Sequence, residues 1–186
     1  INFAFTLLQA TMMKHQADDE LLIKGFEILS EHAALRGDPE LTKDKVGLLA
    51  FDNLDPTYLP RTNILHLLIE LISITHGSTQ QVAVNCLIEV CSSASAGMGC
   101  ATATPGEVQA LLSALQIEVT AVRDAGLRGL RAMLASLEID VNLQLRIWVA
   151  KFDPVEENRE LADKLWIEAR LDNDNLCMEV LQDVVH

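Results

Sequence analysis

The stretch that decides the fold runs from Thr104 to Leu137 and reads TPGEVQALLSALQIEVTAVRDAGLRGLRAMLASL. It contains two apolar stripes with the spacing of an α-helix, one from Val108 to Leu115 and one from Val119 to Leu137. Thr104 and Glu107 form a capping-box pattern, which predicts the start of the first helix. A helix pair this short has no closed core of its own, so it must stack on similar pairs.

A repeated step of a small residue followed four positions later by a bulky one indicates that such pairs recur. The step occurs at Gly25/Leu29, Ala83/Leu87, Gly126/Leu130 and Ala162/Trp166. The intervals are 58, 43 and 36 residues, and HEAT or armadillo repeats run at roughly 40–47, so the first interval predicts an insertion. Four such steps also arise by chance in a chain rich in alanine and leucine, so the repeat needs a second signal.

Two arginines supply that signal. Arg123 and Arg159 each precede an inward bulky residue by seven positions, which is about 20° on a helical wheel. A charge on the buried side needs a partner, and Asp153 in the turn six residues before Arg159 is placed to provide it. An Asp-Pro turn followed by an inward arginine is typical of HEAT repeats. The predicted fold class is therefore all-α, an α-solenoid of HEAT/armadillo-type antiparallel helix pairs.

The pattern divides the chain into one array segment over residues 1–186, with about nine helices. The chain begins and ends inside apolar patterns, so we expect a fragment of a longer array. The expected parts are pairs over 1–35, 60–92, 105–137 and 141–170, a truncated pair over 173–186, and an insertion over 36–59.

Composition argues against several classes of function. The net charge of −13 disfavours a general nucleic-acid binder, and no apolar run reaches the ~18 residues of a membrane span. The four cysteines lack metal-ligand spacing, which favours reduced thiols in a cytoplasmic protein. His66 lies in an apolar helix and is interpreted as a packed histidine. No nucleophile–base arrangement is recognisable, so we expect no enzyme activity, no cofactor, no metal and no direct small-molecule ligand.

Arg128 and Arg131 are the candidate contact residues, because both lie on the outer side of their predicted helix. Two interpretations stay open. They contact an anionic partner such as ribosomal RNA, or they belong to a solvated helix face that Asp124, Glu138 and Asp140 balance.

A family resemblance is carried by the pattern LRxWVxKFDxxEExRxLAxxLW over residues 145–166, together with LRGL at 127–130 and LPR at 59–61. This pattern resembles the middle of the general-control translational activators, which are very large cytosolic HEAT arrays. The resemblance is specific over about residues 105–170 and looser from 59 to 104. It implies a position upstream of the segment that is similar to elongation factor three.

The resemblance implies a non-catalytic scaffold that works through a parent protein. In this family the parent binds ribosomes and activates the kinase of initiation factor two alpha during amino-acid starvation. The known kinase-binding segment lies further on, so no known binding residue transfers to this chain. Ile117 departs from the HEAT turn pattern, and Glu118 is the expected substitute partner of Arg123. The alternative is a HEAT adaptor of another system, such as a nuclear transport receptor or a phosphatase scaffold.

Overall fold

The computed structural model describes residues 2–37, 61–92 and 103–171. Within these ranges the chain forms eight α-helices and one short 3-10 helix, and no strand, so the predicted all-α class is confirmed. The helices are α1 (Asn2–Lys14), α2 (Asp19–Gly37), α4 (Arg61–Ile74), α5 (Gly77–Ser92), α6 (Pro105–Ala114), α7 (Thr120–Ala132), η3 (Leu134–Ser136), α8 (Val141–Ala150) and α9 (Glu156–Glu168).

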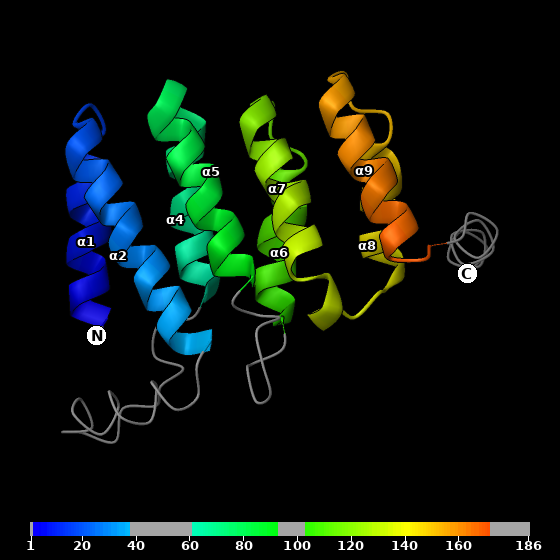
Figure 1. The fold of residues 1–186 in the computed structure, drawn as a ribbon, viewed down its shortest axis with the longest axis horizontal. Coiled ribbons are helices and arrows are strands. Elements are labelled where there is room, and N and C mark those ends of the chain that lie inside the picture. The colour runs from blue at the N-terminus through cyan, green and yellow to red at the C-terminus, as the bar shows by residue number, and fades with distance from the viewer. Residues whose placement is uncertain (1, 38–60, 93–102, 172–186) are drawn as a thin grey trace, which may run out of the picture.

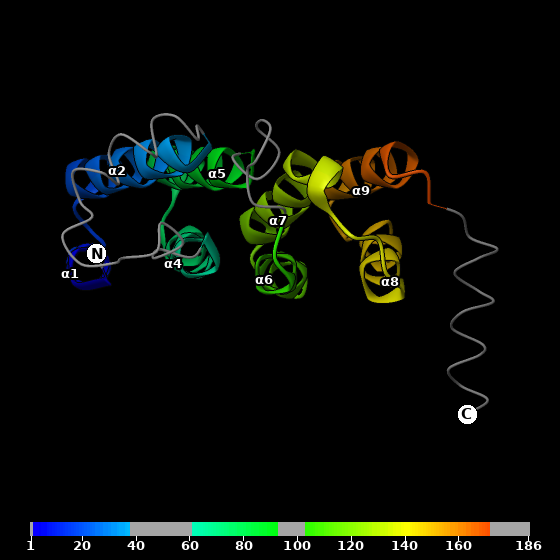
Figure 2. The same ribbon diagram turned by 90° about the horizontal axis from the view of Figure 1, so that it is seen from below.

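The helices form two layers (Figures 1 and 2). The layer of second helices contains α2, α5, α7 and α9, and each of these contacts the next one along the array. The layer of first helices contains α1, α4, α6 and α8, each in contact with the second helix of its own pair. This arrangement is an α-solenoid, in which every pair contacts mainly its neighbours.

The part of the array that the sequence analysis assigned to an insertion, 36–59, lies outside the described residues except for its first two positions. The expected truncated pair over 173–186 lies wholly outside them. The division of the chain into an insertion and five pairs therefore stays a prediction.

One apolar core runs along the array between the two layers. The bulky members of the repeated step, Leu29, Leu87, Leu130 and Trp166, are all buried in it. Their small partners are needed for close helix approach. A Cβ on Gly126 would lie 3.2 Å from the backbone oxygen of Leu111 and 3.3 Å from Cβ of Ala114 in α6. The small-then-bulky pattern is thus a packing feature and not a chance alignment.

The start of α6 follows the predicted capping box. The Thr104 side chain accepts a hydrogen bond from the Glu107 N–H, and the Glu107 carboxylate accepts one from the Thr104 N–H. Two expectations for neighbouring helices are wrong. α7 ends at Ala132, where η3 follows, instead of continuing to residue 137. His66 is exposed and not packed, because it lies on the outer side of α4.

Candidate functional site

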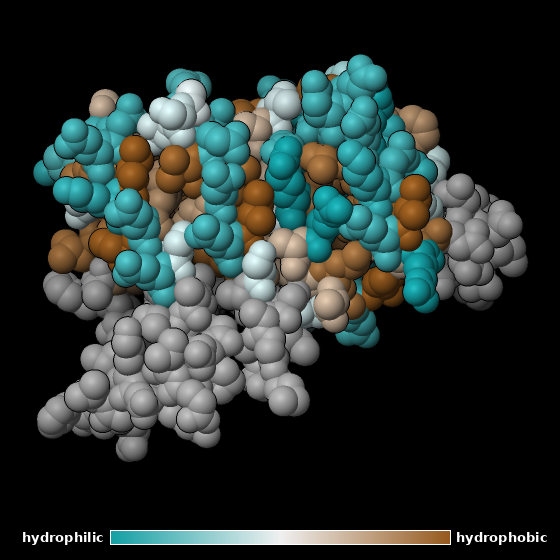
Figure 3. Space-filling model, viewed as in Figure 1, coloured by the Kyte–Doolittle hydropathy of each residue, from teal (hydrophilic) through white to brown (hydrophobic). Residues whose placement is uncertain are grey.

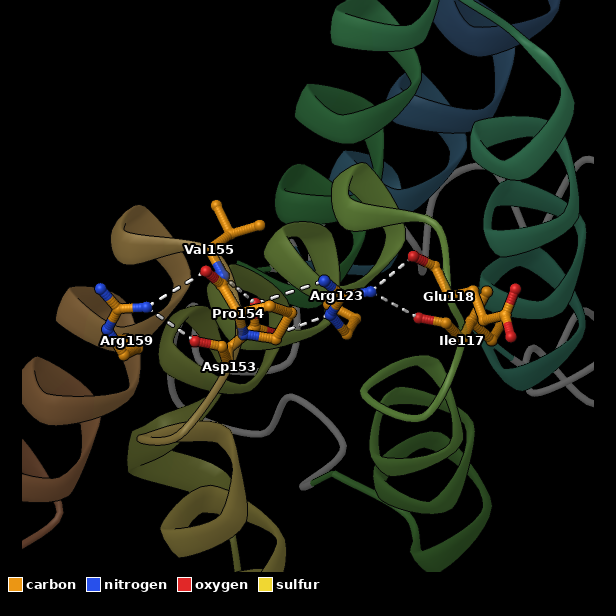
Figure 4. Close-up of polar contacts among 7 residues, drawn as sticks. All are labelled: Ile117, Glu118, Arg123, Asp153, Pro154, Val155 and Arg159. Atoms are coloured by element: carbon orange, nitrogen blue, oxygen red, sulfur yellow. Dashed lines mark hydrogen bonds and ion pairs between the residues drawn. The ribbon is translucent and has the colours of Figure 1, made fainter.

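The polar centre of the described array is the turn between α8 and α9, where Asp153 meets Arg123 of α7 (Figure 4). Arg123 Nε donates to Asp153 Oδ2 at 2.6 Å, and Nη2 donates to Oδ1 at 3.2 Å. The same Oδ1 accepts from the Val155 N–H at 2.8 Å, near the start of α9. This bidentate pair is largely buried, with 12% of the Arg123 side chain and 5% of the Asp153 side chain exposed.

Arg123 also binds the turn of its own pair. Its Nη1 donates to the backbone oxygens of Ile117 and Glu118 at 2.9 and 2.6 Å (Figure 4). One guanidinium therefore joins two successive turns, the α6–α7 turn through backbone oxygens and the α8–α9 turn through a carboxylate. An arginine suits this position because its planar group carries five donors in a fixed geometry.

Arg159 makes the same contacts with its own turn. Its Nη1 donates to the backbone oxygens of Asp153 and Pro154 at 2.9 and 3.2 Å. These acceptors lie six and five residues before the arginine, as Ile117 and Glu118 do before Arg123. Arg123 and Arg159 are therefore equivalent positions of a 36-residue repeat.

Two expected ion pairs are corrected by this geometry. Asp153 does not pair with Arg159 through its carboxylate, because that group faces the preceding pair and holds Arg123. Glu118 does not replace a missing aspartate either, since Arg123 binds its backbone oxygen and not its carboxylate. Helical periodicity places an arginine on the inner side but does not say which of two neighbouring turns it reaches.

Gln80 occupies the arginine position of the second pair, 43 residues before Arg123, and sequence reasoning missed it. Its Nε2 donates to the backbone oxygens of Ile72 and Thr75, both at 2.9 Å. The amide thus satisfies its own turn as the arginines do. The α6–α7 turn has Ile117 at the position that Asp153 occupies in the α8–α9 turn. The second and third pairs therefore have neither the arginine nor the aspartate of the charged link. A glutamine six residues after the end of α4 identifies this position only once the register of the repeat is known.

The pKa of Asp153 lies below its usual value. Burial alone would raise the pKa, but the hydrogen bonds from Arg123 and the Val155 N–H, together with the Arg123 charge, outweigh it. The carboxylate is therefore held in its charged form. The arrangement acts as a structural clasp between two repeats.

The candidate contact residues Arg128 and Arg131 are exposed, and each is already in an ion pair. Arg128 Nε lies 2.8 and 2.9 Å from the two carboxylate oxygens of Asp124. Arg131 reaches Glu168 of α9 at 2.6 and 2.7 Å, a pair that raises the pKa of Arg131 and lowers that of Glu168. Figure 3 shows that hydrophilic side chains cover much of this face of the array.

Within residues 2–37, 61–92 and 103–171, no group of three or more His, Cys, Asp or Glu side chains is placed to hold a metal ion. None of the helices described combines the length and apolar character that crossing a bilayer requires.

Comparison with known proteins gives a consistent family assignment. Residues 133–186 match the family model described as "Stalled ribosome sensor GCN1, HEAT repeats". The mouse protein named stalled ribosome sensor GCN1 is 36% identical over 179 residues, and its human counterpart is 35% identical over 194. These matches cover 92% and 99% of this chain but only 6% and 7% of the relatives. No solved structure matches the chain. The chain belongs to the family of the stalled ribosome sensor GCN1 and corresponds to a short stretch of its HEAT-repeat array.

Proposed function

We propose that this chain is a non-catalytic scaffold segment of a ribosome-associated sensor in the cytoplasm. The observation that carries the proposal is the 35–36% identity, over nearly the whole chain, to two proteins named as sensors of stalled ribosomes. The stacked architecture supports it, because each pair contacts mainly its neighbours and so sets the local shape of a longer array.

In its finer form, the proposal places the segment upstream of the part of the parent that is similar to elongation factor three. The parent binds ribosomes and promotes phosphorylation of initiation factor two alpha by its kinase during amino-acid starvation. The role of this segment is to keep the array at the curvature that lets distant parts of the parent reach ribosome and kinase together.

Arg128 and Arg131 are the proposed ribosome contacts within the segment. Both are half-exposed on the second-helix face, and each keeps donors that its carboxylate partner does not use. A phosphate oxygen can therefore bind without breaking either ion pair. The contact is electrostatic, so it weakens as the salt concentration rises.

The test is polysome sedimentation of the full-length parent carrying Arg128→Glu and Arg131→Glu. We expect weaker association, most clearly at low salt, and reduced kinase activation under starvation. The folding cost is small, about 1 kcal/mol per exposed pair. The matched control, Asp124→Arg with Arg128→Asp, keeps an i,i+4 pair and the net charge. Unchanged sedimentation of the double reversal would reject this face as a contact, and a parent that never sediments with ribosomes would reject the proposed function itself.

A further inference from the structure

An ion pair crosses the seam between α7 and α9 at positions that the repeat defines. Arg131 lies five residues after Gly126, the small residue of the α7 step. Glu168 lies six residues after Ala162, the small residue of the α9 step. The Arg131 guanidinium binds both carboxylate oxygens of Glu168, at 2.6 and 2.7 Å. The fifth position of one second helix therefore meets the sixth position of the next one.

The same register puts Ser30 and Glu89 in this relation at the seam between α2 and α5. Ser30 lies five residues after Gly25, and Glu89 lies six residues after Ala83. Both residues line one groove of about 410 Å³ between these two helices, which lie side by side in the second-helix layer (Figures 1 and 2). The carboxylate of the ion pair is thus present at this seam, but a serine replaces its arginine. The groove lies where the other seam holds a guanidinium.

The groove is acidic, and its charges have no counter-charge in the described part of the chain. Glu27 and Glu31, one turn apart on α2, line it together with Glu89, and all three are exposed. No lysine, arginine or histidine is among the described residues that line it, and Lys24 of α2 stays outside. α5 cannot supply a lysine or arginine, because residues 62–122 contain none. The ion pairs among the described residues involve none of these three carboxylates.

The bottom of the groove is apolar. Phe26 and Cys86 line it while being only 1% and 2% exposed, and the half-buried Val82 lies beside them. A long basic side chain can bury its methylene stem on such a surface while its charged end stays near water. A guanidinium is more weakly hydrated than an ammonium and matches a carboxylate with two parallel donors. Apolar bottom and acidic rim together therefore suit an arginine better than a lysine.

We propose that the groove between α2 and α5 binds an arginine side chain from a basic segment of a partner protein. Glu89 accepts the guanidinium as Glu168 does at the other seam, while Glu27 and Glu31 attract neighbouring positive charges of the segment. The net charge of −13 draws a basic partner from a distance and repels nucleic acids and anionic membranes. This surface belongs to the first two pairs, so it does not depend on the ribosome contacts proposed for the third.

The test uses the 186-residue chain and three fluorescein-labelled peptides of one glycine–serine sequence with three spaced arginines, lysines or glutamates. By fluorescence anisotropy at low salt, the arginine peptide should bind at least about threefold tighter than the lysine peptide, because only a guanidinium makes the bidentate contact. The glutamate peptide should not bind. Glu89→Gln should weaken binding of the arginine peptide about fivefold. Ser30→Arg restores the arginine of the other seam within the chain, so it should weaken binding at least as much.

Two matched controls should bind like the wild type. Ser30→Ala removes the hydroxyl without adding a charge, and Glu138→Gln removes one exposed carboxylate before α8, away from the groove. Glu89→Gln changes an exposed side chain at nearly constant shape, so it should keep the wild-type thermal midpoint and decides the outcome even if Ser30→Arg unfolds. Equal losses in Glu89→Gln and Glu138→Gln would mean attraction by net charge alone and would overturn the proposal. So would equal affinity for the arginine and lysine peptides, or wild-type binding by a folded Ser30→Arg chain.

Discussion

Arg123 joins two helix pairs through one guanidinium, and its removal should be the costliest single change in the polar turns. Arg123→Ala leaves the buried Asp153 carboxylate without its counter-charge, which typically costs about 3–5 kcal/mol. Arg159→Ala removes only two hydrogen bonds to backbone oxygens, which is worth about 1–3 kcal/mol. Urea unfolding of both variants measures the difference. An equal loss for the two substitutions would contradict the assignment of the carboxylate to Arg123.

The same clasp should make stability depend on pH in the acid range. The folded-state pKa of Asp153 is lowered relative to the unfolded chain, so its contribution is fully present above the unfolded value near 3.8. It is lost as the pH falls through the folded pKa. Thermal midpoints between neutral pH and pH ~2 should therefore fall more in the wild type than in Asp153→Asn, which has no titratable group there. Parallel curves for the two proteins would exclude a stabilising charged form.

Arg170 offers a stabilising change. It follows α9 with φ of 54°, and the N–H groups of Arg170 and Leu171 bond back to Ile167 and Trp166 in a Schellman arrangement. A side chain in this left-handed conformation costs about 1–2 kcal/mol, which glycine avoids at a smaller entropic cost. We expect Arg170→Gly to raise the free energy of unfolding by about 0.5–1 kcal/mol. Arg170→Ala, which keeps the strain, is the control.

The sequence predicted which residues take part in the polar turns but not which arginine pairs with the Asp153 carboxylate. Arg123, Arg159 and Asp153 were selected because a charge on an inward face needs compensation. Sequence spacing connects a residue most readily with its own turn, whereas Asp153 faces the preceding pair because its carboxylate also binds the Val155 N–H. The sequence did not point to Gln80, because a neutral amide carries no charge that would require a partner when it is buried.

The contact between helices α6 and α7 is sensitive to side-chain volume. Gly126→Leu must place a side chain where a Cβ alone lies 3.0 Å from Leu115 Cδ2 and 3.2 Å from a backbone oxygen. Overpacking of this kind costs about 1–3 kcal/mol and pushes neighbouring helices apart. Calorimetry should show a lower midpoint for Gly126→Leu. Ser113→Leu, which adds the same side chain on the exposed face of α6, should unfold like the wild type.

The sequence predicted a helix boundary correctly where the residues that form the cap are close together in the chain. The Thr104–Glu107 capping box needs four consecutive residues and was predicted correctly. The end of α7 was not, because Met133, Leu134 and Leu137 continue the apolar pattern while the backbone tightens into η3. The burial of His66 was predicted wrongly for a related reason. In a mostly apolar helix, the sequence does not show which narrow strip of side chains faces solvent.

Over the whole molecule, the layers follow from the repeat, while the links between repeats are unequal. The third and fourth pairs share the charged clasp, whereas Gln80 and Ile117 stand at the matched positions between the second and third. The second and third pairs are joined mainly by apolar contacts around Gly129, whose Cβ would meet Leu87 and Leu111 at 3.0 Å. Such unequal links cannot be predicted from the repeat alone, since they depend on which side chain each turn directs to its neighbour.

The buried thiol of Cys86 in α5 can report how often the contact between α5 and α2 opens. Cys86 Sγ donates to the Phe26 backbone oxygen of α2 at 3.5 Å, and burial raises the pKa of Cys86 to about 12. The thiolate needed for reaction with a disulfide reagent therefore forms only when α5 separates from α2. In a chain with Cys91→Ser, Cys100→Ser and Cys177→Ser, labelling at pH 8 should proceed at the intrinsic thiol rate multiplied by the fraction of time that this seam is open. Labelling as fast as in urea would mean that the first pair does not stay docked, whereas a slow rate converts directly into the opening free energy of one seam in the stack.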